Sequence, residues 1–102
     1  MGKILYNITI KVNLDIQLEW LQWMKEVHIP EVMSTGFFVE YKISRILEQD
    51  ESDGVTYAIQ YLCSSLDDYE TYRDRFAPAL QLKHAERFKD KFVAFRTIME
   101  VV

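Results

Sequence analysis

Apolar and polar residues alternate along four segments of the chain, at residues 4–12, 37–47, 55–63 and 92–101. In the first segment, every second residue from Ile4 to Val12 is apolar. This period of two residues is typical of a β-strand with one buried face. The polar stretch 48–54 ends in Asp-Gly and predicts a hairpin loop. The pattern therefore predicts four strands, with the middle two paired as a hairpin.

The segments between these strands have the three-to-four-residue period of helices. We predict a first helix from about Asp15 to about His28, because Pro30 lacks an N–H and disfavours helical torsions in the residue before it. A short further turn over 31–33 is compatible with the pattern. Ser65 with Asp68 three residues later resembles a capping box and predicts a helix over 66–76. Pro78 suits the first turn of another helix, over 78–88.

The resulting order, β-α-β-β-α-β, predicts an α+β protein of the ferredoxin-like class. Right-handed crossovers would place the first and third strands at the centre of a four-stranded antiparallel sheet, with the helices on one face. A length of 102 residues suits a single domain, which we place at residues 1–102.

The second face of this sheet has no helix to cover it. Alternation leaves several apolar residues there: Leu5, Phe38, Ile46, Leu62 and Ile98. This is more apolar area than a solvated face usually exposes. We therefore predict a homodimer that packs sheet against sheet, with a solvated face as the alternative.

The composition of the chain argues against several classes of function. The net charge of −4 argues against nucleic acid as a partner. No apolar run approaches the ~20 residues that span a bilayer. Cys63 is the one cysteine, so an intramolecular disulfide is impossible and a reducing, cytoplasmic location is expected. Neither a cofactor nor a metal site is expected, since the glycines are isolated and the two histidines are 56 residues apart.

The first helix carries the candidate chemistry. Trp20, Trp23 and Met24 share one apolar arc of the helical wheel, and His28 lies at its edge. His28 can serve as a general base beside an aromatic wall, or it can cap the end of the helix, where the dipole favours the charged imidazole. The tryptophans suit core packing or the wall of a flat-ligand site.

We place the candidate pocket between this helix and the sheet, with His28 as the catalytic candidate. Aromatic walls with a few polar tips are typical of small-molecule pockets. The ligand-binding candidates are Trp20, Trp23, Met24, Tyr41, Tyr57, Tyr61, His84 and Phe95.

The sequence also resembles a known family. The shared stretches are 20–24, 28–33, 35–36, 50–61, 77–84, 87–88 and 92–97, together with Phe38. They resemble small bacterial proteins grouped as "domain of unknown function 4286". The resemblance implies the dimeric α+β barrel superfamily, in which ferredoxin-like protomers join through their sheets. That superfamily contains cofactor-free monooxygenases, haem-degrading enzymes, isomerases, decarboxylases and ligand-sensing modules, so it implies a fold and no single function.

Two functions fit this sequence. The first is a homodimer that binds an apolar or aromatic small molecule, with cofactor-independent chemistry at His28 as an option. The second is a non-enzymatic interaction or regulatory module, and whether the protein is an enzyme stays open. A cavity of ~300 Å³ or more that touches His28 would favour the first, and dense packing there the second.

Overall fold

The sheet has four antiparallel strands, as predicted. The structure is a computed structural model that describes residues 2–102. Its strands are β1 (Ile4–Asn13), β2 (Phe38–Arg45), β3 (Gly54–Cys63) and β4 (Phe92–Glu100), in the spatial order β2-β3-β1-β4. All three strand pairs are antiparallel, and β1 and β3 are central. The ferredoxin-like topology is confirmed.

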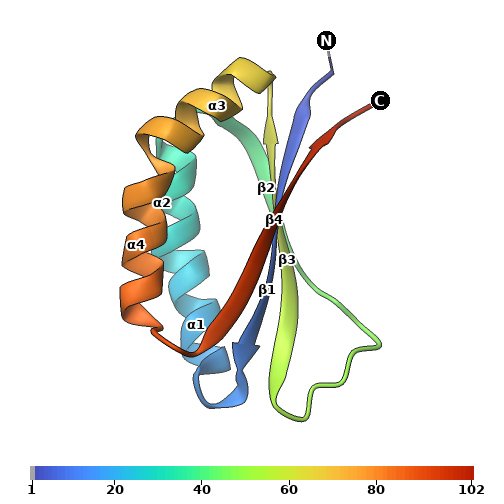
Figure 1. Ribbon diagram of the computed structural model, residues 1–102, viewed down its shortest axis with the longest axis vertical. Helices are drawn as coiled ribbons and strands as arrows, with labels where there is room; N and C mark the ends of the chain where they lie inside the picture. The colour runs from blue at the N-terminus through green and yellow to red at the C-terminus, as the bar shows by residue number, and fades with distance from the viewer. Residues whose placement is uncertain (1) are drawn as a thin grey trace.

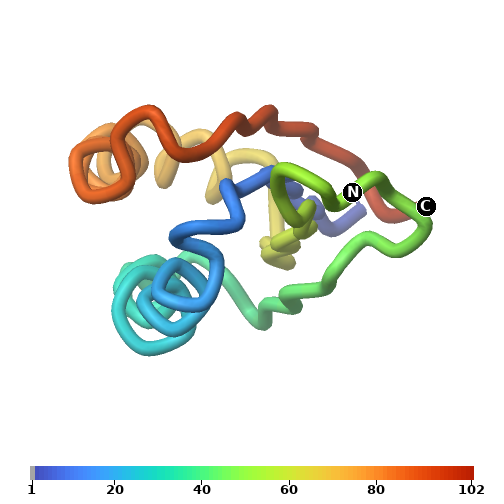
Figure 2. The backbone as a smooth tube through the Cα atoms, turned by 90° about the horizontal axis from the view of Figure 1, so that it is seen from below, coloured from blue at the N-terminus to red at the C-terminus, as the bar shows by residue number. Residues whose placement is uncertain are grey.

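All helices cover one face of this sheet (Figure 1). The first helical segment comprises η1 (Leu14–Ile16), α1 (Gln17–Trp23), η2 (Met24–His28) and α2 (Ile29–Ser34), and the second comprises α3 (Leu66–Arg75) and α4 (Ala77–Arg87). In Figure 2 the first segment and α4 lie side by side over the sheet. Within residues 2–102, no helix has both the length and the apolar character needed to cross a membrane.

Pro30 does not end the first helix, which corrects the prediction. The helix continues to Ser34 because η2 is a π-helical turn, in which the N–H of Ile29 donates to the carbonyl of Met24 five residues earlier. The wider turn changes the hydrogen-bond pattern at this point, so that the helix tolerates a proline without an N–H and has room for its ring. Gly36 ends the segment with a positive φ of 84°, which glycine adopts without strain.

A β-bulge in β2 reverses the predicted direction of two residues. Phe38 pairs with Cys63, whereas Glu40 pairs with the adjacent Leu62, so Val39 is the extra residue. Phe38 consequently points towards the helices, is 7% exposed and packs 4.7 Å from the ring of Tyr72. Strict alternation over 37–47, which puts Phe38 on the uncovered side, would put Val39 on the helix-covered side, but Val39 is 57% exposed.

The direction of β4 was also predicted wrongly. Arg96 lies opposite Ile8, and Ile98 lies opposite Tyr6, so both are on the helix-covered side. Phe95 lies opposite Thr9 on the uncovered side and is 63% exposed. We call the uncovered side the open face. Its exposed or half-buried apolar residues are Leu5, Ile46, Leu62, Val93, Phe95 and Met99.

The cap and the proline position predicted for the second helical segment are confirmed. The backbone N–H of Asp68 donates to Ser65 Oγ at 3.1 Å, which confirms the predicted cap of α3. Pro78 lies in the first turn of α4, where its missing N–H leaves no helical bond unmade. This helix brings Leu80, His84 and Phe88 down onto the core.

Candidate functional site

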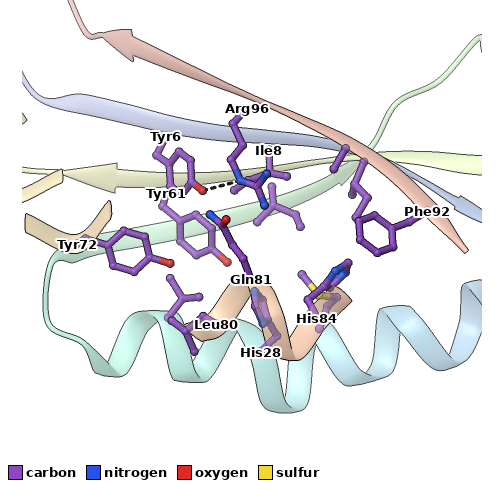
Figure 3. Close-up of a pocket in the computed structure, with 15 residues that line it drawn as sticks. Tyr6, Ile8, His28, Tyr61, Tyr72, Leu80, Gln81, His84, Phe92 and Arg96 are labelled. Carbon is purple, nitrogen blue, oxygen red and sulfur yellow. Dashed lines mark hydrogen bonds between the residues drawn. The ribbon is translucent and has the colours of Figure 1, made fainter. Parts of the chain in front are cut away.

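A small cavity lies between η2, α4 and the sheet. Its volume is about 40 Å³. Ala94 leaves room beneath β4, while Met24, Val32 and Leu80 supply apolar wall. Figure 3 shows side chains from the helices and from the sheet converging on this space. The polar residues that line it are Tyr6, His28, Tyr61, Tyr72, Gln81, His84 and Arg96.

His84 is fixed in this cavity by Trp20. The indole Nε1–H donates to His84 Nε2 at 2.8 Å, between two buried side chains. A neutral imidazole that accepts at one nitrogen carries its proton on the other. His84 therefore holds its proton on Nδ1. The ring of Phe92 lies edge-on at 4.4 Å and blocks rotation.

His28 is placed by different contacts. Its ring stacks on Trp23 with 5.2 Å between centroids and lies 5.7 Å from the ring of His84. His28 Nδ1 is buried and has no hydrogen-bond partner in the part of the chain that is described. The expected capping bond to a helix-end carbonyl or to Glu31 is therefore absent at this nitrogen. A buried nitrogen without a partner is costly, and a ligand with a suitable polar atom would relieve that cost.

Both histidines are neutral at pH 7. Burial lowers the pKa of His28 to about 4, with opposition from Glu31 and smaller contributions from Arg96 and Lys83. Burial also lowers the pKa of His84 to about 4, aided by His28 and Arg96. The expectation that a helix end favours charged His28 was wrong, because His28 lies inside a continuous helix and its imidazole is partly desolvated.

The sheet and α3 supply hydroxyls, and β4 supplies one cation. Arg96 Nε donates to Tyr6 Oη at 3.1 Å. Burial raises the pKa of Tyr61 and of Tyr72, so both hydroxyls keep their protons. No carboxylate of residues 2–102 lies within 4.0 Å of the Arg96 guanidinium. The cavity therefore carries one charge, which is positive.

The structure brings together only part of the predicted site. Met24, His28, Tyr61 and His84 line the cavity. Trp20 and Trp23 lie behind them and support the two imidazoles. The sequence left core packing and the wall of a flat-ligand site open for the two tryptophans, and in the structure neither lines the cavity.

Three candidates lie elsewhere. Tyr57 packs 5.1 Å from Trp20, and its hydroxyl accepts from Gln17, outside the cavity. Tyr41 is 45% exposed on the edge strand β2. Phe95 lies on the open face because β4 presents its other row to the helices.

The sequence reasoning missed Tyr6, Tyr72, Gln81 and Arg96. Tyr6 belongs to the alternating row of residues 4–12, a pattern that predicts burial but does not indicate a site. Arg96 carried a usable signal: it is the one basic residue within the apolar stretch 92–99. A cation in such a stretch either pairs with a carboxylate or serves a site.

The chain belongs to the family described as "Domain of unknown function (DUF4286)", whose pattern matches residues 3–102. The resemblance seen in the sequence is therefore confirmed. No functionally curated protein matches the chain.

Several solved structures share the fold. SnoaB from Streptomyces nogalater, a cofactor-independent oxygenase, has a TM-score of 0.74 at 13% identity, with 100% of this chain and 95% of that chain covered. An EthD-like protein from Ralstonia eutropha JMP134 has a TM-score of 0.71 at 16% identity, with 100% and 94% covered. A dimeric ferredoxin-like protein from an uncultured marine organism has a TM-score of 0.61 at 15% identity, with 100% and 97% covered. At such identities these similarities show the fold alone.

Proposed function

We propose that this protein is a homodimer that binds a small molecule with an apolar or aromatic body at the cavity between η2, α4 and the sheet. The single observation that carries the proposal is the buried Nδ1 of His28, which has no partner within residues 2–102 and belongs to a residue that lines the cavity. Buried polar atoms in proteins nearly always have a partner. A ligand would supply the one that is missing here.

The size of the cavity sets how the ligand enters. A volume of about 40 Å³ holds only a few water-sized groups, well below the ~300 Å³ of a typical ligand pocket. One polar group of the ligand therefore enters, and its body stays at the mouth. Figure 3 shows Gln81 from α4 and Arg96 from β4 pointing towards each other over this space. Rotation of these two long side chains would widen the opening.

His28 is the candidate for proton transfer. Its neutral imidazole can accept a hydrogen bond or a proton from an acidic hydroxyl of the ligand. Its low pKa makes it a weak base, so an acidic substrate suits it better than an unactivated one. Cofactor-independent chemistry is the form of catalysis we propose to test, since the proposed site uses only side chains of this chain.

A thermal-shift screen against apolar and aromatic metabolites, with haem included, tests binding. We expect at least one compound to raise the melting temperature of the wild-type protein and not that of His28→Ala. His28→Ala should leave dimerisation unchanged. A variant that no longer folds would assign His28 to structure, and a screen without any hit would contradict the proposal.

The small cavity also favours a second function, a non-enzymatic interaction module. In that case the cavity is only a small packing gap between the helices and the sheet, and the open face is the surface that binds a partner. Phe95 and Val93 expose 63% and 69% of their surface there, which is uncommon for apolar residues without a partner. The same screen separates the two functions, because a module of this kind would bind no small molecule at His28.

We propose that the open face joins two copies of the chain. A shallow hollow of about 380 Å³ beside Thr9, Ile46 and Phe95 offers a partner a place to insert side chains. A two-fold interface would pair this surface with itself. We further propose that residues 1–102 act as one domain in a reducing compartment such as the cytoplasm, since Cys63 is a buried free thiol.

A further inference from the structure

The cavity has a charge opposite to that of the whole protein. The chain has a net charge of −4 at pH 7. Among the 15 residues that line the cavity, Arg96 alone carries a formal charge, and it is exposed at the mouth. Within the described chain no carboxylate lies close enough to form an ion pair with it. An unpaired guanidinium beside a polar cavity favours an anion over a neutral molecule or a cation.

Most of the other polar groups at the cavity are hydrogen-bond donors. Trp20 occupies the acceptor nitrogen of His84, so the group that His84 presents to a ligand is its Nδ1–H. The protonated hydroxyls of Tyr61 and Tyr72 and the amide of Gln81 add further donors. A ligand that complements this lining needs several acceptor lone pairs in a small space.

The volume restricts the acceptor group. About 40 Å³ admits a group of roughly three non-hydrogen atoms, since one water needs about 10–15 Å³ of such space. A carboxylate has that size, bears one negative charge, and accepts two hydrogen bonds from a guanidinium in a planar arrangement.

We propose that the cavity binds the carboxylate of a small organic acid, with Arg96 and the Nδ1–H of His84 as donors, and that Trp20 holds His84 in the tautomer that this requires. The proposal rests on the proposed function, because it names the ligand class of the same site. Trp20 is a positioning residue in it: its indole lies behind His84 and not among the lining residues.

Matched pairs of acids and amides test the proposal. Benzoate with benzamide, and acetate with acetamide, have nearly equal shapes but differ in charge. We would titrate each into the ¹⁵N-labelled protein and follow the imidazole and guanidinium signals. We expect benzoate to shift the signals of His84 and Arg96 and to bind at least about tenfold more tightly than benzamide. Equal binding of acid and amide, or no binding of either acid, would overturn the proposal.

Arginine variants assign the charge contact. Arg96→Gln should weaken benzoate binding by at least about tenfold. Arg75→Gln is the matched control, because Arg75 packs over Phe76 outside the cavity and its loss should leave binding unchanged. Benzoate binding that is the same in Arg96→Gln and in the wild type would contradict the role of Arg96.

The tautomer can be measured without any variant. The ¹⁵N shifts of the His84 ring should show a proton on Nδ1 and a lone pair on Nε2 in the wild-type protein. Trp20→Phe should give a mixture of tautomers and weaker benzoate binding, whereas a purely structural Trp20 would leave the tautomer unchanged. If the acids fail while neutral aromatic compounds still bind at His28, the carboxylate proposal falls and the proposed function stands. If nothing binds at all, both fall.

Discussion

The two faces of the sheet are built from the same alternating strands but differ in what covers them. On the covered face, Trp20, Tyr61 and Phe88 are at most 2% exposed, and the two histidines lie among them. On the open face, Phe95 and Val93 stay more than half exposed. Apolar surface on the covered face is buried on folding, whereas apolar surface on the open face stays exposed in the single chain. The core and the candidate site therefore lie on one face, and the dimerisation that we propose would use the other.

Two phenylalanines give the largest test of this contrast. Phe88→Ala should cost about 3–5 kcal/mol of unfolding free energy, because it removes a buried ring that packs against Trp23 and His84. Phe95→Ala, the same change on the open face, should cost less than about 1 kcal/mol for the single chain. Urea denaturation at low protein concentration measures both. Equal losses would show that the open face belongs to the folding core.

The pH dependence of stability tests the covered face next. Both histidines have a folded pKa of about 4, below the ordinary value of 6.5, so the unfolded chain binds more protons between these values. Stability should therefore be complete above about pH 6.5 and fall as the pH drops towards about 4, by on the order of 3 kcal/mol for each histidine. Denaturant melts at several pH values measure this fall. His28→Gln combined with His84→Gln should flatten the profile above about pH 4.5; an unchanged slope would assign it to other groups.

A charge on the open face should break the assembly. Phe95→Glu should weaken dimerisation by at least about a hundredfold, because each dimer would bury two carboxylates, while the fold is retained. Leu18→Glu is the matched control, since Leu18 is 76% exposed on α1, away from the open face. Sedimentation equilibrium measures both variants. A wild-type protein that stays monomeric would refute the dimer itself.

The smallest expected effect comes from a residue on neither face. Ser65→Ala removes the oxygen that accepts from the backbone N–H of Asp68, and it should cost about 1 kcal/mol. Dimerisation and ligand binding should not change. Thermal unfolding with parallel light scattering measures this variant, and a change in assembly would mean that α3 contributes to the interface.

The element order was predictable because each signal was local. Alternation from Ile4 to Val12, the polar hairpin loop and the Ser65 cap each depend on a few neighbouring residues. The end of the first helix was mispredicted at Pro30 because a π-turn can accommodate a proline within a helix. No residue type in the sequence predicts such a turn. Phe38 was misplaced by a one-residue bulge, which exchanges the two sides of a strand.

The candidate site was only partly predictable for a related reason. Its members come from β1, β3, β4, η2, α2, α3 and α4, so their meeting depends on strand register and on the packing of the helices. On β4 the more apolar row, which includes Val93 and Phe95, suggested the core, yet this row is exposed. Alternation alone does not tell which row of a strand faces the helices when both rows contain apolar residues. The hydrogen bond between Trp20 and His84 spans 64 residues and has no local signature.

The most direct test of the covered face is a pH titration of its two imidazoles by ¹H–¹⁵N NMR. We expect both rings to stay neutral down to about pH 5 and to titrate near the pKa of about 4, with His84 protonated on Nδ1 throughout its neutral range. Titration of both rings near the ordinary pKa of 6.5, without a fixed tautomer for His84, would mean that they are solvated. That result would contradict a desolvated cavity with two neutral histidines, on which the proposed site depends.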